Sequence, residues 1–265
     1  MKTVIIYNKN KKNAEEFYYK LLQEIPKIGC FVIENSKISE ADFFIVLGGD
    51  GTLIKASKMI IDYHKPIVAV NMGSLGFMTE IKVEEAIEVI KEVTGKVYKT
   101  EKRYFLEVSI NNVKYYALNE LVAAKSGFPA RMVRINLFSN GSFVNTYRAD
   151  GIIISSPTGS TAYSMSAGGP IINPKLNAMV ITPISPHTLS TRPIVVPGAD
   201  TLTVEIGDDN EEIYIMLDGQ DNLRVEKNDK IEIKMSEKYI TLVKPEKRDY
   251  YSVLREKLKW GDDIC

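Results

Sequence analysis

The chain has 265 residues, 45% hydrophobic and 26% charged, which suits a globular protein of one large or two modest domains. Basic and acidic residues number 34 each, so the formal net charge is zero, and we expect no nucleic-acid partner. No apolar run is long enough to span a membrane, and the first residues read as a strand rather than a signal peptide. The two cysteines, Cys30 and Cys265, lack metal-ligand spacing, so we expect free thiols in a soluble, cytoplasmic protein with no membrane partner.

The first hundred residues alternate between strand and helix patterns. Apolar runs typical of buried strands occupy residues 3–7, 31–33, 43–47 and 67–70, and apolar side chains recur at helical spacing in residues 13–23, 52–63 and 83–93. This alternation predicts a parallel sheet with helices on both faces. Ligands of such sheets bind beyond the carboxyl ends of the strands.

From about residue 98 the pattern changes to short alternating strands. Residues 134–147 predict a hairpin around Asn140 and Gly141, and further strands are expected at residues 202–206, 213–217, 223–225, 231–235 and 240–243. Residues 251–258 place Tyr251, Leu254 and Leu258 on one helical stripe.

The predicted fold class is therefore α/β plus all-β. Residues 1–97, together with residues 245–265, would form an N-terminal Rossmann-like α/β domain with a parallel sheet. Residues 98–244 would form a C-terminal β-rich domain. The C-terminal helix is expected to return to the first domain and pack on it.

Residues 48–52 read Gly-Gly-Asp-Gly-Thr and directly follow a predicted buried strand. Glycines let backbone N–H groups approach a phosphate closely, and they tolerate the positive φ that we expect in such a turn. Asp50 among those amides would hold a hydroxyl, accept its proton or face a metal ion, so the motif favours phosphoryl transfer. The alternative is a plain turn, because Asp-Gly is a common hairpin signal and recurs at residues 150–151 and 218–219.

A second segment, residues 148–170, opens from an apolar run into a loop of small and hydroxyl-bearing residues followed by Tyr163. Hydroxyls and exposed amides suit ribose and pyrophosphate, and the tyrosine ring offers a surface for a flat base. The alternative is a Ser/Thr-rich surface loop with a tyrosine that belongs to the core.

Several motifs are missing from the sequence. It has no Gly-x-x-x-x-Gly-Lys-Ser/Thr, no Gly-x-Gly-x-x-Gly after the first strand and no Gly-x-Ser-x-Gly, which argues against a P-loop enzyme, an ordinary dinucleotide fingerprint and a hydrolase. His64 and His187 are the only histidines and lack metal-ligand spacing. We therefore expect no metal site built by the protein alone.

Together these segments resemble the NAD kinase family. The resemblance rests on residues 48–52, 71–77 (Asn-Met-Gly-Ser-Leu-Gly-Phe), 119–120, 150–151 and 158–163 (Thr-Gly-Ser-Thr-Ala-Tyr), in the family's order, and is extended by residues 183–187 and 218–220. The first motif alone is shared with diacylglycerol and sphingosine kinases and with 6-phosphofructokinases, whereas residues 158–163 single out NAD kinases. The resemblance implies phosphorylation of the adenosine ribose 2′-hydroxyl of NAD by ATP, or in some members by polyphosphate, to make NADP. It also implies an active site in a cleft and a homodimer or homotetramer.

The resemblance assigns roles to individual residues. Asp50 matches the catalytic aspartate, which would orient the 2′-hydroxyl and take its proton, and Asp150 is similar to the acid near the nicotinamide end. The other predicted nucleotide-binding residues are Gly48, Gly49, Gly51 and Thr52 around the phosphate; Asn119 and Glu120 at the adenosine portion; Thr158, Ser160, Thr161, Ala162, Tyr163 and Ser166 along the dinucleotide; Phe77 as a wall; Gln220; and Arg148 and Ser185, which can reach a neighbouring subunit's site.

Lys55 is our own candidate for a phosphate contact, and its alternative is a solvated helix lysine. Mg²⁺ is expected to arrive with ATP, since phosphate oxygens supply most of its ligands.

Two other functions compete with this interpretation. A lipid or sugar kinase would share residues 48–52 but would need an acyl-chain cleft or an arginine-rich sugar-phosphate site, and the hydroxyl-rich loop fits ribose better. A non-catalytic NAD(P)-binding regulator would keep the pocket but would gain nothing from Asp50. The sequence leaves open whether polyphosphate replaces ATP and whether NADH is accepted.

Overall fold

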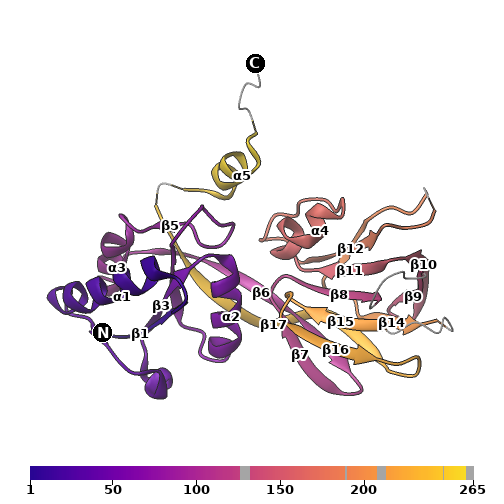
Figure 1. Cartoon of the computed structure of the whole chain (residues 1–265), viewed down its shortest axis with the longest axis horizontal. Helices are drawn as coiled ribbons and strands as arrows, with labels where there is room; N and C mark the ends of the chain where they lie inside the picture. Colours follow the sequence, from indigo (N-terminus) through magenta and orange to yellow (C-terminus); the bar gives the residue numbers. More distant parts are fainter. Residues whose placement is uncertain (126–131, 189, 208–212, 247, 261–265) are drawn as a thin grey trace. The chain divides into compact units, whose positions relative to one another are not determined.

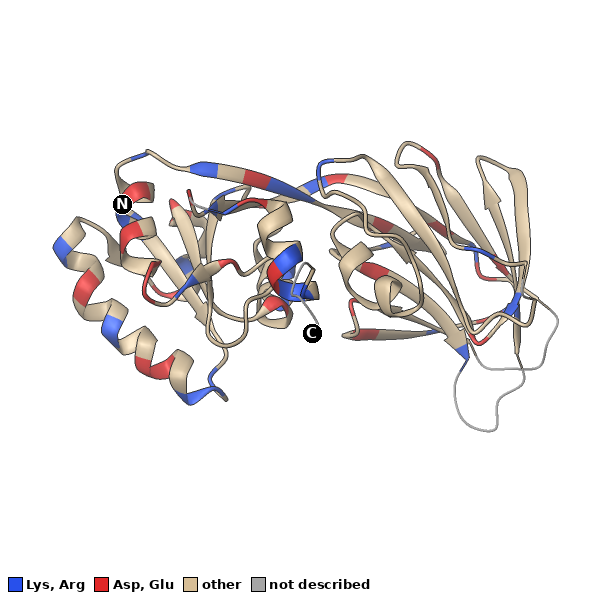
Figure 2. Ribbon diagram, turned by 90° about the horizontal axis from the view of Figure 1, so that it is seen from above, with Lys and Arg blue, Asp and Glu red and all other residues tan. Residues whose placement is uncertain are grey.

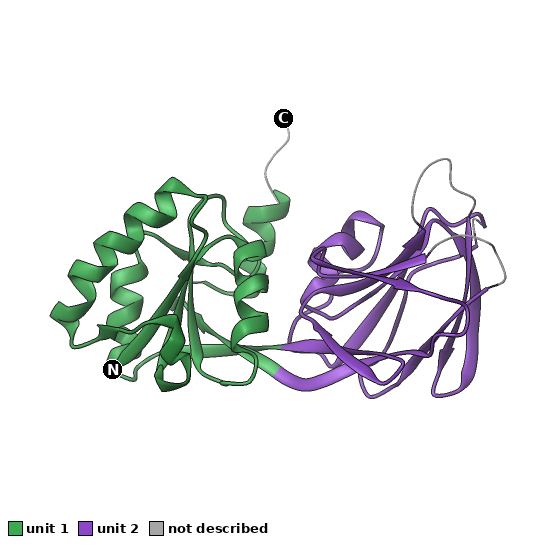
Figure 3. Cartoon of the chain, turned by 60° about the horizontal axis from the view of Figure 1, so that its bottom comes forward, with its two compact units in different colours: residues 1–103, 239–265 green, residues 104–238 purple. Residues whose placement is uncertain are grey.

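The computed structural model describes residues 1–125, 132–188, 190–207, 213–246 and 248–260 (Figure 1). The chain divides into two compact units (Figure 3): unit 1 comprises residues 1–103 and 239–265, and unit 2 comprises residues 104–238. The boundaries predicted from the sequence were 97/98 and 244/245. Of the two cysteines, Cys30 is a buried free thiol, and Cys265 lies outside the described residues.

Unit 1 contains a parallel sheet, as predicted. Its strands are β1 (Lys2–Tyr7), β2 (Phe31–Val32), β3 (Phe43–Gly48), β4 (Pro66–Asn71) and β5 (Ile81–Lys82), and its α-helices are α1 (Lys12–Glu24), α2 (Asp50–Ile60), α3 (Ala86–Thr94) and α5 (Tyr250–Leu258). The order runs β4-β3-β1-β2, with β5 beside β4, and all of these strands pair in parallel. Short 3₁₀ helices cover Ile25–Ile28 and Asn35–Glu40.

Strand β3 shows why this part of the sequence forms a central strand. All its residues are buried, which is typical of a parallel strand covered on both faces. Phe43, Ile45 and Leu47 pack in one cluster with Phe17 of α1 and Val89 of α3, while the alternate side chains point to the other face. Each fully buried side chain of this size contributes about 1.5–3 kcal/mol. The strand therefore holds the turn that follows it on a rigid support.

Helix α5 belongs to unit 1, as predicted, but its buried face differs from the predicted stripe. Val253 and Leu254 are buried, whereas Tyr251 is 59% exposed. Asp249 and Ser252 form a capping box, which fixes the start of the helix at Tyr250. The side chains three and four residues after Tyr250 then face inward, so the prediction for Tyr251 was wrong.

Unit 2 consists of two antiparallel layers around one core. Its strands are the last part of β6 (Lys99–Ile110), β7 (Val113–Ala117), β8 (Glu120–Lys125), β9 (Val133–Ser139), β10 (Ser142–Ala149), β11 (Gly151–Ser155), β12 (Ala178–Ile184), β13 (Ile194–Pro197), β14 (Leu202–Ile206), β15 (Ile213–Leu217), β16 (Asp221–Val225) and the first part of β17 (Ile231–Lys244). One sheet runs β13-β12-β11-β8-β15-β16, and β10-β9-β14-β17 forms the second layer. Ile152 and Ile215 from the first layer pack with Leu137 and Val204 from the second.

The predicted hairpin around Asn140 and Gly141 is confirmed. Both residues have positive φ, as the favoured two-residue hairpin turn requires. A short 3₁₀ helix (Gly159–Thr161) and the one-turn helix α4 (Tyr163–Ser166) follow β11.

Strand β17 corrects the expectation of two separate strands at residues 231–235 and 240–243. It is a single strand of 14 residues. The polar residues 236–238 resemble a turn in the sequence, but Ser236 is buried and its hydroxyl accepts the backbone N–H of Lys238 at 3.0 Å. The strand pairs antiparallel with β14 near its start and parallel with β4 near its end.

Lysine and arginine residues are interspersed with aspartate and glutamate residues along both units (Figure 2), in keeping with the zero net charge. In the described part of the chain, no helix has the length and apolar character of a membrane span.

Candidate functional site

The turn between β3 and α2 leaves a helix N-terminus uncovered. Gly49 is the N-cap residue of α2 and makes no side-chain capping hydrogen bond. Asp50 is the first helical residue. The first N–H groups of a helix have no intrahelical partner and carry the positive end of the helix dipole. A Cβ atom at Gly49 or Gly51 would meet open space. A helix N-terminus with bare backbone of this kind is a candidate anion site.

The glycines of this turn do not adopt the positive φ that we expected. Gly48, Gly49 and Gly51 are absent from the positive-φ glycines, and Gly49 is extended. Gly48 is needed for a different reason, because a Cβ atom there would collide with the side chain of Thr52. At this turn, glycine provides close packing and bare backbone rather than a left-handed conformation.

The Asp50 carboxylate accepts four hydrogen bonds from the loop after β4. Oδ2 accepts the N–H of Phe77 at 2.8 Å, and Oδ1 accepts the N–H of Met78 at 3.2 Å and the N–H and hydroxyl of Thr79 at 3.0 and 2.9 Å. We call these four donors the Asp50 clamp. A Cβ atom on Gly76 would collide with Asp50 Oδ1, so only glycine permits this approach. The motifs at residues 48–52 and 71–77 thus meet at one carboxylate.

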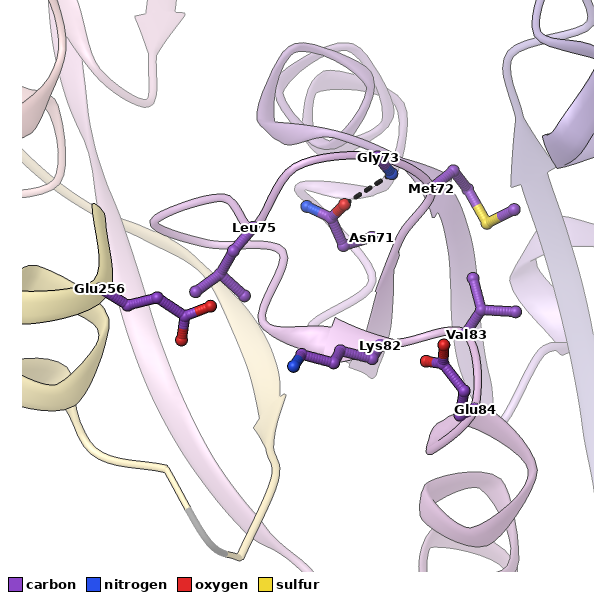
Figure 4. A pocket seen from close by; sticks show the side chains of 8 residues that line it. All are labelled: Asn71, Met72, Gly73, Leu75, Lys82, Val83, Glu84 and Glu256. Carbon is purple, nitrogen blue, oxygen red and sulfur yellow. Dashed lines mark hydrogen bonds between the residues drawn. The ribbon is translucent and has the colours of Figure 1, made fainter.

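Asn71 organises the same loop. Its Nδ2 donates to the carbonyl of Ser74 at 2.7 Å and to the hydroxyl of Thr79 at 3.0 Å, and its Oδ1 accepts the N–H of Gly73 at 2.7 Å (Figure 4). The loop borders a cavity of about 380 Å³, which Glu256 of α5 also lines. Asn71 and Thr79 were not among the predicted site residues. The signal for Asn71 was its position at the carboxyl end of β4 and at the start of the motif 71–77, whereas Thr79 lies at the end of the loop, just before β5, and had no comparable signal.

A second carboxylate clamp lies in unit 2. Asp218 Oδ2 accepts the N–H of Leu118 at 2.9 Å, and Oδ1 accepts the N–H groups of Asn119 and Glu120 at 2.7 and 3.2 Å. Asp218 and Gly219 both have positive φ, so they form the turn between β15 and β16. Residues 218–219 therefore do form a turn, as the alternative interpretation held. In addition, the Asp218 side chain fixes the backbone of residues 118–120.

Asn119 and Glu120 present buried acceptors without partners. Their residues are only 8% and 6% exposed, and Asn119 Oδ1 and Glu120 Oε2 have no hydrogen-bond partner among the described residues. Burial first, and then the nearby Asp218, raise the pKa of Glu120 to about 7, while a hydrogen bond from the backbone of Tyr163 opposes the shift. Unpaired buried acceptors are costly, so these two oxygens are suited to ligand donors.

The hydroxyl-rich loop is tied to the same place. The carbonyl of Asn119 accepts the N–H of Ser156 at 2.8 Å, and a Cβ atom on Gly159 would collide with the Asn119 backbone. Ser160 is fully buried, and its hydroxyl donates to the carbonyl of Pro157 at 2.6 Å and accepts the N–H of Ile172 at 2.9 Å. Its hydroxyl is thus engaged in shaping the loop.

The neighbouring predicted residues differ in exposure. Thr158 is buried and its carbonyl accepts the Thr161 hydroxyl at 3.2 Å. Ala162 is half-buried and Ser166 is exposed. Tyr163 is 45% exposed, so the alternative that it belongs to the core is wrong.

The remaining predicted residues lie at several places. Asp150 Oδ1 is 2.6 Å from Nζ of Lys125, a partner that the sequence analysis missed. Lys55 is exposed on α2, Arg148 is exposed on β10, Ser185 is exposed after β12, and Gln220 closes the β15–β16 turn by donating to the Leu217 carbonyl at 3.0 Å. Each unit thus brings together its own set: Asp50, the glycine turn and Phe77 in unit 1, and residues 118–120 with the 156–166 loop in unit 2.

The described residues include no group of three or more His, Cys, Asp or Glu side chains suited to holding a metal ion.

Comparison with known proteins places this geometry in a family. Residues 31–98 match the model of the ATP-NAD kinase N-terminal domain, and residues 118–245 match that of the ATP-NAD kinase C-terminal domain. An NAD kinase of Fusobacterium nucleatum is 39% identical over 266 residues and covers 100% of both chains. One from Geotalea daltonii is 43% identical over 228 residues, which cover 84% of this chain and 80% of that one.

Solved structures agree in fold. The structure of an Archaeoglobus fulgidus NAD kinase in complex with ATP has a TM-score of 0.80 and 27% identity, covering 97% of this chain and 99% of that chain. Yeast NADH kinase complexed with NADH has a TM-score of 0.87 at 23% identity, covering 100% of this chain and 89% of the other. The matched domains and full-length relatives show that this chain belongs to the NAD kinase family.

Proposed function

We propose that the chain transfers the γ-phosphoryl group of ATP to the adenosine ribose 2′-hydroxyl of NAD, making NADP, and that Asp50 orients this hydroxyl and accepts its proton. The observation that carries the proposal is the Asp50 clamp, which fixes a carboxylate at the uncovered N-terminus of α2. Transfer of a phosphoryl group to an alcohol needs both an acceptor for the proton and a place for the phosphate.

The clamp leaves one oxygen of Asp50 with more capacity to accept a further hydrogen bond. A carboxylate offers about four lone-pair positions. Oδ1 already accepts three of the four donors, whereas Oδ2 accepts only the N–H of Phe77. Oδ2 therefore has the capacity to accept the 2′-hydroxyl. A carboxylate is a weak base for an alcohol, so the proton leaves late and orientation contributes as much as basicity.

The turn around Asp50 supplies the phosphate site in this proposal. Gly49 and Gly51 leave the first N–H groups of α2 open, and Gly48 packs against Thr52 to set the turn. Lys55 is exposed one turn further along the helix and would add a positive charge. Phosphoryl transfer passes through a loose transition state, so positioning and charge neutralisation provide most of the rate enhancement.

The residues of unit 2 bind NAD in this proposal. Asn119 Oδ1 and Glu120 Oε2 accept donors of the adenosine portion, and the exposed ring of Tyr163 packs on the base. Asp150, held by Lys125, lies near the nicotinamide end. The supporting residues are Thr161, Ala162 and Ser166 along the dinucleotide; Thr158, Ser160 and Gln220, which shape the backbone; Phe77 as a wall; and Arg148 and Ser185 toward a neighbouring subunit's site.

In this proposal Mg²⁺ enters as part of the substrate MgATP, because phosphate oxygens are its preferred ligands. We further propose a cytoplasmic homodimer or homotetramer. Two alternative substrates remain to be assayed: polyphosphate as the phosphoryl donor and NADH as the acceptor.

The proposal is tested by incubating the purified protein with NAD and MgATP, and by locating the phosphate of the product with ³¹P NMR. NADP phosphorylated at the 2′ position is the expected product. Parallel assays replace ATP by polyphosphate, NAD by NADH, and NAD by diacylglycerol or fructose 6-phosphate. A folded protein that binds NAD but makes no NADP with either donor would contradict the proposal and favour a regulator that binds NAD(P).

A further inference from the structure

Glu80 directly follows Thr79, the last residue of the Asp50 clamp, and is only 3% exposed. Its carboxylate pairs with Nζ of Lys244 at the end of β17, and its backbone carbonyl accepts a hydrogen bond from Nη1 of Arg248. These partners lie 164 and 168 residues further along the chain. The C-terminal part of unit 1 therefore fixes the backbone immediately after the clamp.

Arg248 joins two points of the same segment. Besides bonding the Glu80 carbonyl, its Nη2 lies 3.6 Å from Oε1 of Glu85, and the other oxygen of Glu85 accepts the N–H of Lys82 at 3.1 Å. A planar guanidinium with donors on several nitrogens can serve a carbonyl and a carboxylate at once, whereas an ammonium on a flexible stem holds such a pair less rigidly. The guanidinium thereby braces residues 80–85.

Helix α5 contacts the other end of the clamp. Nζ of Lys257 lies 5.6 Å from the centre of the Phe77 ring, which is a cation–π distance, and the N–H of Phe77 donates to Asp50. Glu256, the preceding residue, lines the cavity beside Asn71 (Figure 4). Lys244, Arg248 and Lys257, which we call the C-terminal brace, therefore contact both Phe77 and Glu80.

The charges around Glu80 are buried, which favours a positioning role. Burial raises the pKa of Glu80, and Lys244 and Arg103 oppose that shift. Arg103 is itself buried and lies 2.5 Å from Glu101. A buried ion pair stabilises a protein little compared with apolar packing, but removing one partner leaves an uncompensated charge. Such a network is therefore better suited to fixing one geometry than to adding stability.

We propose that Lys244 and Arg248 are positioning residues, which hold Glu80 and thereby keep the Asp50 clamp where it orients the reacting carboxylate. The inference rests on the function proposed above for Asp50. A misplacement of about 1 Å that originates away from the chemistry can cost on the order of 100-fold in rate. In this proposal Arg248 acts on turnover more than on NAD binding, because it bonds the carbonyl of Glu80, directly after Thr79 of the clamp.

The test compares Arg248→Ala and Arg248→Lys with Arg255→Ala, a matched control that removes an exposed arginine of α5 outside the C-terminal brace. We expect Arg248→Ala to lower kcat about 10- to 100-fold with little change in KM for NAD. The amides of residues 77–79 should exchange their hydrogens faster than in the wild type. Arg248→Lys should have a kcat and an exchange rate between those of Arg248→Ala and the wild type. Arg255→Ala should match the wild type in both.

Unchanged kcat, or unchanged amide exchange at residues 77–79, in a folded Arg248→Ala protein would overturn the proposal. If Arg248→Ala does not fold, Arg248→Lys is measured in its place, because it keeps the charge but loses the double contact with Glu80 and Glu85. Wild-type values of kcat and of amide exchange in Arg248→Lys would then contradict the proposal. A wild type without turnover would instead refute the proposed function. The exchange measurement would still decide whether Arg248 holds the clamp.

Discussion

Asp50 and Thr79 are joined twice: Oδ1 of Asp50 accepts both the backbone N–H and the side-chain hydroxyl of Thr79, at 3.0 and 2.9 Å. The same hydroxyl accepts Nδ2 of Asn71 at 3.0 Å. This chain of hydrogen bonds connects the carboxyl ends of β3 and β4. It places a carboxylate in one orientation on two rigid strands.

Removing the Thr79 hydroxyl should lower both turnover and stability. In Thr79→Val the backbone N–H of residue 79 remains, but Asp50 and Asn71 each lose a buried partner. We expect the free energy of unfolding to fall by about 1–3 kcal/mol. We expect kcat to fall about tenfold or more, because the carboxylate is less well oriented. Urea unfolding and NADP formation measure the two effects.

Thr146→Val is the matched control. It removes a hydroxyl that donates to Oδ1 of Asn136 at 2.7 Å on the β9–β10 hairpin. We expect a loss of stability there without a change in kcat. Equal turnover by Thr79→Val and the wild type would mean that this hydroxyl does not orient Asp50.

Two glycines of unit 1 should respond differently to alanine. Gly51→Ala places a methyl group in open space, so its free energy of unfolding should stay equal or rise by up to about 1 kcal/mol. The methyl group stands where phosphate approaches, so kcat/KM should fall about tenfold. Gly76→Ala collides with Asp50 and Thr79, so it should lose about 1–3 kcal/mol of stability as well as activity. A fully active Gly51→Ala would contradict phosphate binding at the start of α2.

The sequence predicted the central strands of unit 1 well because β3 and β4 are buried on both faces and give clear apolar runs, but it did not predict β5 or the backbone conformation of the 48–52 turn. It also identified residues 48–52 and 71–77 as motifs. It could not show that Asp50 accepts the amides of the other motif, because this contact depends on the parallel pairing of β3 with β4. A local pattern carries no such information.

Other features had no signal in the sequence. Glu80, Lys244 and Arg248 meet across more than half of the chain, and each alone resembles a solvated charge. In β17, Ser236 looked like part of a turn but is buried in a continuous strand. Asn119 and Glu120 were named through the family resemblance, and their unpaired buried oxygens became visible only in the structure.

Glu120 should make stability depend on pH. Burial and Asp218 raise its pKa from 4.5 to about 7, so the folded state binds a proton more tightly than the unfolded state. The contribution of this proton binding to the free energy of unfolding is fully present below pH 4.5 and is lost as the pH rises through about 7. The shift corresponds to about 3 kcal/mol.

Urea unfolding at pH 5 and pH 8 compares the wild type with Glu120→Gln. The variant should lose less stability over this interval, and Glu205→Gln, which changes an exposed glutamate of β14, should behave as the wild type. The same loss in all three proteins would contradict the assignment to Glu120.

Tyr163 should contribute its ring rather than its hydroxyl. Because Tyr163 is 45% exposed, its ring is available to a ligand, and we expect Tyr163→Ala to raise KM for NAD about 10- to 100-fold, which matches the stacking of a base on an aromatic ring. Tyr163→Phe should keep a KM close to that of the wild type. Steady-state kinetics at saturating ATP provide the measurement, and a large effect of the phenylalanine variant would point to the hydroxyl instead.

The most direct test of the account is Asp50→Asn, measured by NADP formation and by calorimetric titration with NAD. The side-chain amide cannot take the proton of the hydroxyl, and its nitrogen would face a clamp donor. We predict that NAD binding is kept and that turnover falls by roughly 10²–10⁴-fold or more. Asp200→Asn is the control, since Asp200 accepts hydrogen bonds from Ser139 and Asn140 on a hairpin of unit 2. Turnover close to that of the wild type in Asp50→Asn would remove Asp50 from the reaction and contradict the account.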